Sequence, residues 1–270
     1  MSFNFAAPCQ TLSPLVKQYW ALDNIMEKGK YHSQRIIPTG LIELTIYLED
    51  KPLALHGGEA VSDPSFLSGQ QNMPYDLKVS GHVSVFSITF HPQGAQMFFD
   101  IPMDEIIDQT VSLRHLQSDF IDQVEEDLYE AAGFSERVRV MDQFLIKLLH
   151  LKQKHTEIPR LMSVISQIDR TRGMISIDSL AKEACLSRKQ FERVFKSGVG
   201  ISPKRFLRII RLQHAIFRKQ TESGVSLTRL AYDCGYYDQS HMINDFKYLT
   251  GMSPRKYFSE CDPYSDYFLQ

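Results

Sequence analysis

Six polar and basic residues between positions 187 and 196 have the types and spacing of a surface that contacts nucleic acid. They are Ser187, Arg188, Lys189, Gln190, Arg193 and Lys196. With 3.6 residues per turn, Phe191, Val194 and Phe195 share one helical face. The two lysines and Arg193 project from the opposite face. A helix fits the major groove of DNA, where Arg and Lys reach phosphates and guanine edges. Taken alone, the segment fits a solvated surface helix slightly better.

A second set of polar residues lies about fifty positions further along the chain. Its members are Gln239, Ser240, His241, Asn244 and Lys247. Met242, Phe246 and Leu249 form the apolar face of the helix predicted there, and the polar set lies outside it. This set is far less basic than the first. Asn244 has the donor and acceptor needed to pair with adenine, and equally the character of a solvated polar residue.

Both polar sets lie on the second helix of a predicted helix pair. In the first pair, Ser176 caps the first helix, and Ser187 with Gln190 forms a capping box that begins the second. The pattern returns at an offset of about 50 residues, with Ser226 and Asp238 as caps. Two short helices joined by a tight turn describe a helix-turn-helix. The duplication therefore predicts two such units, at about 177–197 and 227–249, and reverses the preference for a plain surface helix.

The helix between these units and the charge around it support the same interpretation. Ser202-Pro203 begins a helix that runs to about Lys219, roughly 25 Å long. That length is of the order needed to set two DNA readers about one duplex turn, ~34 Å, apart. Residues 158–258 hold 18 Lys and Arg against 8 Asp and Glu, whereas residues 1–157 hold 12 against 21. A chain with a basic C-terminal part and an acidic N-terminal part is typical of nucleic-acid-binding proteins. Electrostatic attraction between the two parts would produce the same asymmetry of charge. Three arginines on this helix fit phosphate contact or a solvated face: Arg208, Arg211 and Arg218.

The first 150 residues show strand periodicity and then helix periodicity. Residues 42–48 and 83–90 alternate apolar and polar, which predicts half-buried antiparallel strands in a small barrel or sandwich. Residues 116–128 and 141–149 have an apolar residue at every fourth position, which predicts two helices that either pack on the barrel or mediate self-association. Glu43 is interpreted as a strand-end ion-pair partner rather than an acid catalyst. A polar stretch between residues 150 and 159 marks the predicted domain boundary.

Composition and motifs exclude several classes of function. The 270 residues, 43% hydrophobic and 23% charged, have the composition of globular proteins and the length of two domains. No apolar run reaches the ~18 residues of a membrane span. Four scattered cysteines and the lack of an export pattern predict a cytoplasmic protein without a disulfide framework. The surroundings of His56, His82 and His91 lack metal-ligand spacing, and no Gly-x-Ser-x-Gly, Gly-rich phosphate loop or His-Glu-x-x-His motif occurs. We expect no enzymatic activity, metal, cofactor or membrane partner.

The C-terminal pattern resembles the AraC/XylS family of bacterial transcription regulators. The matching residues are Leu180-Ala181, Ser187, Phe191, Arg193, Phe195-Lys196, Gly200, Ser202-Pro203, Phe206, Ala231, Gly235-Tyr236, Asp238-Gln239-Ser240, Phe246-Lys247, Thr250-Gly251-Met252-Ser253-Pro254 and Tyr257. The sequence departs from the family pattern at Cys185, which replaces a turn glycine, at Met242, which replaces an aromatic residue, and at Asn244-Asp245, which replaces an arginine-containing pair. The resemblance implies seven helices with two recognition helices in successive major grooves. With Arg193 intact, the first unit is the expected dominant reader.

The N-terminal part is similar, more loosely, to a sensor-like domain found ahead of such modules. The similarity rests on residues 15–20, 37–44 and 88–94, and it implies an effector-binding or dimerising β-barrel. We therefore predict an α+β protein with two domains. Residues 1–150 form a β-barrel-like sensor domain with flanking helices, and residues 158–261 form an all-α DNA-binding module with two helix-turn-helix units.

The predicted function is sequence-specific transcriptional regulation. The expected partners are double-stranded DNA, a small-molecule effector of unidentified chemistry, RNA polymerase and a second copy of the chain. One alternative is a β-barrel enzyme or small-molecule binding protein whose helical tail mediates protein contacts. Another is a nucleoid-type DNA binder without sequence preference.

Overall fold

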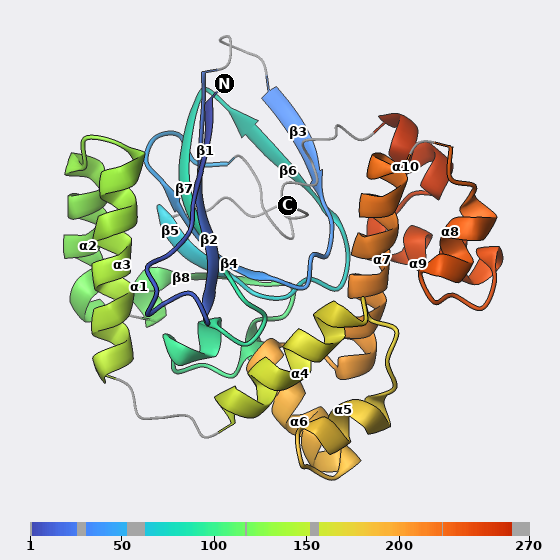
Figure 1. Cartoon of the computed structure of the whole chain (residues 1–270). Coiled ribbons are helices and arrows are strands. Elements are labelled where there is room, and N and C mark those ends of the chain that lie inside the picture. Colours follow the sequence, from blue (N-terminus) through green and yellow to red (C-terminus); the bar gives the residue numbers. More distant parts are fainter. Residues whose placement is uncertain are drawn as a thin grey trace.

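Strands occupy the N-terminal part of the chain and helices the C-terminal part (Figure 1). The computed structural model describes residues 2–25, 31–52, 63–116, 118–151, 157–222 and 224–260. Residues 152–156 of the predicted boundary, His56 and position 261 lie outside these ranges. The mixed fold, a sheet domain followed by a helical region, is confirmed.

The described strands form two antiparallel sheets. They are β1 (Ser2–Ala6), β2 (Val16–Ile25), β3 (Tyr31–Ile36), β4 (Ile42–Tyr47), β5 (Ser65–Ser68), β6 (Tyr75–Ser80), β7 (His82–Phe90) and β8 (Thr110–Ser112). Six of them pair in the order β1-β2-β7-β4-β5-β8, and β3 pairs with β6. Because β1 and β8 stand at opposite edges, the described pairings give an open sheet, and closure into a barrel is not shown.

One face of the larger sheet is covered by helices. Leu44 lies opposite Ile88 and Ile46 opposite Phe86, and the alternation of a strand sends all four side chains to this face. They join one buried core with residues of α2 (Ser118–Glu130) and α3 (Phe134–Leu151), which follow the short α1 (Leu113–Leu116). The two apolar helical stripes therefore pack on the sheet, as one of the two alternatives predicted.

The other face of the larger sheet meets the two-stranded sheet. Val79 of β6 is buried with Tyr47, Phe66 and Val85 of the larger sheet, so apolar contact joins the two sheets. The 3-10 turns η2 (Ala95–Met97) and η3 (Met103–Ile106) follow β7 and lead to β8.

Glu43 accepts hydrogen bonds from two other strands. Its Oε1 accepts hydrogen bonds from Trp20 Nε1 and Thr89 Oγ1, each 2.9 Å long. Burial raises the pKa of Glu43 to about 7 against these hydrogen bonds, which favour the charged form. Two neutral donors hold the carboxyl group, and the positive charge of Lys17 also favours its charged form.

The C-terminal part consists of seven helices in the described residues. They are α4 (Ile158–Arg170), α5 (Ile177–Glu183), α6 (Arg188–Val199), α7 (Pro203–Thr221), α8 (Leu227–Asp233), α9 (Gln239–Thr250) and α10 (Pro254–Glu260). Helix α7 has 19 residues and lies between the pair α5–α6 and the pair α8–α9 (Figure 1). Its buried Phe206 belongs to a core that holds Phe195 of α6 and Phe246 of α9. The three helices are thus fixed to one another by shared apolar contact.

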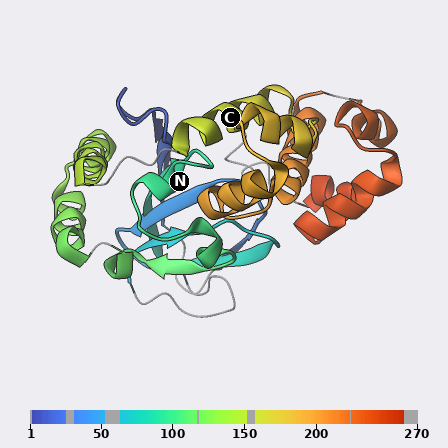
Figure 2. The same ribbon diagram turned by 90° about the horizontal axis from the view of Figure 1, so that it is seen from below.

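The helical part docks on the sheet domain on the side away from α2 and α3, as Figure 2 shows. Ile37, which precedes β4, is buried in the core of the helical part. Gln213 Nε2 of α7 donates a 2.7 Å hydrogen bond to the carbonyl of Pro38. Arg205 of the same helix donates to the carbonyl of Asn72. The sheet domain and the helical part, predicted as separate domains, are therefore in contact, and side chains of α7 make both of these hydrogen bonds.

Candidate nucleic-acid interface

The turn between α5 and α6 is built from local hydrogen bonds. Ser176 Oγ accepts from the amide of Ser179 and begins α5, as predicted. At the turn, Cys185 has φ of 53°, a left-handed conformation that favours glycine. The amide of Leu186 donates to the carbonyl of Ala181 at 3.0 Å, which closes the end of the helix. Ser187 and Gln190 then form the predicted capping box at the start of α6.

The turn between α8 and α9 repeats this arrangement. Gly235 has φ of 73°, and the amide of Tyr236 donates to the carbonyl of Ala231 at 3.0 Å. The carboxylate of Asp238 accepts from the amide of His241 at 2.7 Å and begins α9, as predicted. Hence the departure at Cys185 does not change the turn: a side chain there occupies a conformation that glycine occupies in the second pair.

The exposed side of α6 carries the basic residues predicted for it. Lys189 and Arg193 are exposed, and neither makes an ion pair with any other residue in the described ranges. Arg188 pairs with Glu192 at 3.1 Å and with Asp178 at 3.4 Å. These carboxylates raise the pKa of Arg188, with the hydrogen bond to Glu192 as the largest cause. The structure thus leaves Lys189 and Arg193 as the basic groups most available to a ligand.

Two other members of the first set are engaged within the protein. The Lys196 ammonium lies 3.3 Å from the Asp104 carboxylate in η3 of the sheet domain. The Gln190 side chain accepts hydrogen bonds from the amide and hydroxyl of Ser187. Gln190 therefore helps to fix the start of α6, and Lys196 links the end of that helix to the sheet domain.

The second set also lies along one helix, α9. Ser240, His241, Asn244 and Lys247 are exposed, whereas Gln239 accepts a 2.7 Å hydrogen bond from Thr228 Oγ1 of α8. The His241 ring packs edge-on against the Tyr236 ring, with centroids 5.4 Å apart. This face offers hydrogen-bonding groups and a single lysine.

The arginines of α7 that the sequence offered for phosphate contact are largely occupied. Arg208 makes a two-pronged pair with the buried carboxylate of Asp245 in α9, its shortest distance being 2.7 Å. This hydrogen bond raises the pKa of Arg208 against the opposing effect of burial. Arg218 pairs with Glu222 and Asp233 at 2.6 and 2.8 Å. These arginines hold the helices together.

Sequence reasoning missed the groups that join α9 to α7. Tyr248 has Arg205 over its ring at 4.4 Å and Arg208 at 5.2 Å. Asp245 is buried beside them. The one available signal was the position of Asp245 next to Phe246, on the apolar side of the helix. No local signal connects Asp104 to Lys196, because 92 positions of sequence separate them.

The described residues contain neither a cluster that could bind a metal ion nor a helix that could span a membrane. None of their His, Cys, Asp and Glu side chains form a group of three or more that could hold a metal ion. None of the helices in the same ranges is long and apolar enough to cross a membrane.

Comparison with known proteins gives two family matches on different parts of the chain. Residues 180–260 match a family described as a helix-turn-helix domain. Residues 4–112 match a family described as a domain of unknown function (DUF6597). The first match covers both turns, the capped starts of α6 and α9, and the exposed faces of these two helices.

Similar proteins are transcriptional regulators by name. An uncharacterized HTH-type transcriptional regulator of Haemophilus influenzae is 38% identical over 30% of this chain and 27% of its own length. The HTH-type transcriptional regulator MtrA of Neisseria gonorrhoeae is 36% identical over 34% of this chain and 31% of its own length. The chain therefore matches about a third of the length of these curated relatives. A transcriptional regulator with an AraC-type DNA-binding domain from Chromobacterium violaceum has 24% sequence identity and a TM-score of 0.35, over 38% of this chain and 91% of that one.

A sheet domain followed by helix pairs with left-handed turns and matching caps defines a helix-turn-helix protein. The resemblance of the C-terminal helical part to AraC/XylS regulators, seen in the sequence, is confirmed.

Proposed function

We propose that this chain is a sequence-specific, DNA-binding transcriptional regulator. In it, α5–α6 and α8–α9 are two helix-turn-helix units, and α6 and α9 enter successive major grooves. One observation carries the proposal: two helix pairs with the same turn and cap geometry each present an exposed polar helix face. At ~1.5 Å per residue the connecting α7 is about 28 Å long, of the order of one duplex turn.

The residues of α6 have different proposed roles. Arg193 and Lys189 contact base edges or phosphates directly, because they are exposed and need to break no ion pair. Arg188 and Lys196 exchange their carboxylate partners for phosphate oxygens. Ser187 and Gln190 act at the start of the helix, where free amide groups favour an anion.

The residues of α9 serve the neighbouring groove. The proposed contacts are made by Gln239, Ser240, His241, Asn244 and Lys247. Since this face carries one lysine, its contribution is chiefly hydrogen bonding, and the α6 unit supplies most of the electrostatic attraction. Asn244 is exposed, in keeping with a role at an adenine edge.

We propose that residues 1–150 form the sensor domain and residues 158–261 the DNA-binding domain. The contact between the two sheets supports a barrel-like arrangement. The pair between Lys196 and Asp104 supports communication, because it joins a DNA-facing helix to the sensor domain. A small-molecule effector, RNA polymerase, a second copy of the chain and a cytoplasmic location are further proposals that rest on the family. The named relatives are regulators, which supports a protein that is not an enzyme.

Selection from a pool of random-sequence duplexes with the full chain at one fixed salt concentration tests this function. Enrichment of one motif that spans two adjacent major grooves is the expected result. Equal retention of all sequences would contradict sequence specificity and favour a nucleoid-type binder. A complete lack of duplex retention would overturn the assignment as a DNA-binding protein.

A further inference from the structure

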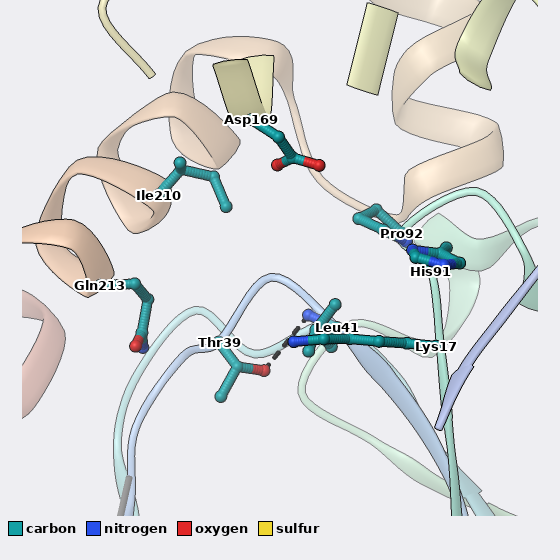
Figure 3. A pocket seen from close by; sticks show the side chains of 8 residues that line it. All are labelled: Lys17, Thr39, Leu41, His91, Pro92, Asp169, Ile210 and Gln213. Carbon is teal, nitrogen blue, oxygen red and sulfur yellow. Dashed lines mark hydrogen bonds between the residues drawn. The ribbon is translucent and has the colours of Figure 1, made fainter. Parts of the chain in front are cut away.

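A cavity of about 230 Å³ lies between the sheet domain and the helical part. Its walls are drawn in Figure 3: Lys17, Thr39, Leu41, His91, Pro92, Asp169, Ile210 and Gln213. Strand β2 and the segments flanking β4 and β7 provide one side, and helices α4 and α7 provide the other. Any molecule in this cavity contacts both parts of the chain at once.

Opposite charges approach the cavity from its two sides. In Figure 3 the carboxylate of Asp169, at the end of α4, points down from the upper side of the cavity, and the half-buried side chain of Lys17 runs along its lower side. Burial lowers the pKa of Lys17 and raises that of Asp169, and the attraction between the two groups opposes both shifts. One basic and one acidic side chain therefore line the cavity.

The remaining walls are neutral. Burial lowers the pKa of His91, and the positive charge of Lys17 lowers it further, so the imidazole is uncharged at neutral pH. Leu41, Pro92 and Ile210 supply apolar surface. Thr39 Oγ1 accepts from the amide of Leu41 at 3.2 Å, and its hydroxyl hydrogen remains a donor.

The geometry points to a small zwitterion of the size of an α-amino acid as the ligand of this cavity, and we propose that it is the effector. The ligand carboxylate meets Lys17, its ammonium meets Asp169, and a short apolar side chain lies against Leu41 and Ile210. At ~30 Å³ per water-sized group, the volume admits a molecule of about eight non-hydrogen atoms. L-Valine has this size. A simple monoanion would meet the like charge of Asp169, and a simple monocation that of Lys17.

The position of the cavity gives such a ligand a regulatory consequence, which rests on the proposed function as a regulator. Helix α7 lines the cavity with Ile210 and Gln213 and also joins the two helix pairs. A ligand that contacts both parts stabilises the docked arrangement in which Gln213 donates to Pro38 and Lys196 pairs with Asp104. Ligand binding therefore holds α6 and α9 in the positions that they take in the docked arrangement.

Calorimetric titration of the full chain without DNA tests the ligand chemistry. The probes are L-alanine, L-valine and L-leucine, with 3-methylbutanoate and 2-methylpropylamine as forms of valine that lack the ammonium or the carboxylate. The expected result is that one of the amino acids binds and that both truncated probes bind at least tenfold more weakly. Equal binding of a truncated probe, or no binding of any probe, would overturn the proposal.

Two variants locate the site. Lys17→Met and Asp169→Asn should each weaken amino-acid binding at least tenfold, and Asp169→Asn should improve binding of 3-methylbutanoate relative to L-valine. Asp178→Asn, an exposed acid on α5 outside the cavity, is the matched control and should bind as the wild type does. Unchanged binding by both cavity variants would overturn the site. Because no DNA is present, these results are independent of whether the chain reads DNA.

Discussion

Replacement of Arg193 by alanine removes the most available cation of α6. Arg193 is exposed and makes no ion pair with another described residue, so it can bind DNA without breaking an existing ion pair. A bidentate contact with guanine contributes about 1–3 kcal/mol, and its loss should weaken binding about 5- to 150-fold. If Arg193 contacts phosphate instead, affinity falls for all sequences and the salt slope decreases by about one.

Alanine variants of two other lysines, Lys196 and Lys256, provide a comparison for this prediction. Lys196 must first leave Asp104, a partly exposed pair that contributes about 0–1 kcal/mol, so Lys196→Ala should cost less than Arg193→Ala. Lys256→Ala removes the same charge from α10, where Lys256 pairs with Glu260, and serves as the control. Fluorescence anisotropy with the selected duplex, at three or more salt concentrations, gives affinity and slope together. An Arg193→Ala variant with wild-type affinity, specificity and salt slope would refute the assignment of α6 as the main reader.

Three further predictions concern the stability of the folded chain. Asp245→Asn should lower the free energy of unfolding by about 3 kcal/mol, because it leaves Arg208 without its buried carboxylate; a loss below 1 kcal/mol in urea unfolding would contradict this. The pKa of Glu43 is raised from 4.5 to about 7, so the protonated carboxyl group stabilises the folded state. As pH rises from about 4.5 through 7, the free energy of unfolding of the wild type should therefore fall by on the order of 3 kcal/mol relative to that of Glu43→Gln. Parallel plots of unfolding free energy against pH for the two proteins would exclude this. Cys185→Gly should raise the unfolding free energy by about 1 kcal/mol by relieving a left-handed cysteine, and an unchanged or lowered melting temperature would count against that strain.

The helix pairs were predictable because their signals are local. A capping box needs only Ser187 and Gln190, and a left-handed turn needs only Gly235 with its neighbours. Each interaction spans a few residues, so the order of residue types determines it. The repeat at an offset of about 50 then located the second copy, including its start at Asp238.

The features that the sequence did not predict depend on contacts between distant segments. Closure of a sheet depends on which strands meet at its edges, and the alternation within β4 or β7 carries no information about that. The hydrogen bonds of Glu43 were not predictable, because Trp20 and Thr89 reach it from two other strands. Likewise, the α7 arginines looked like free cations until Asp245 was placed beside Arg208. Charge by itself does not reveal which basic residues are already paired.

Hydroxyl-radical footprinting of the full chain on its selected duplex tests the central claim most directly. Two units on one connecting helix should protect two patches of backbone about 10 base pairs apart. Arg193→Ala should lose protection at the patch contacted by α6 and retain it at the other. A single patch for the wild-type protein, or protection spread evenly over any sequence, would contradict an account in which both helix pairs read DNA.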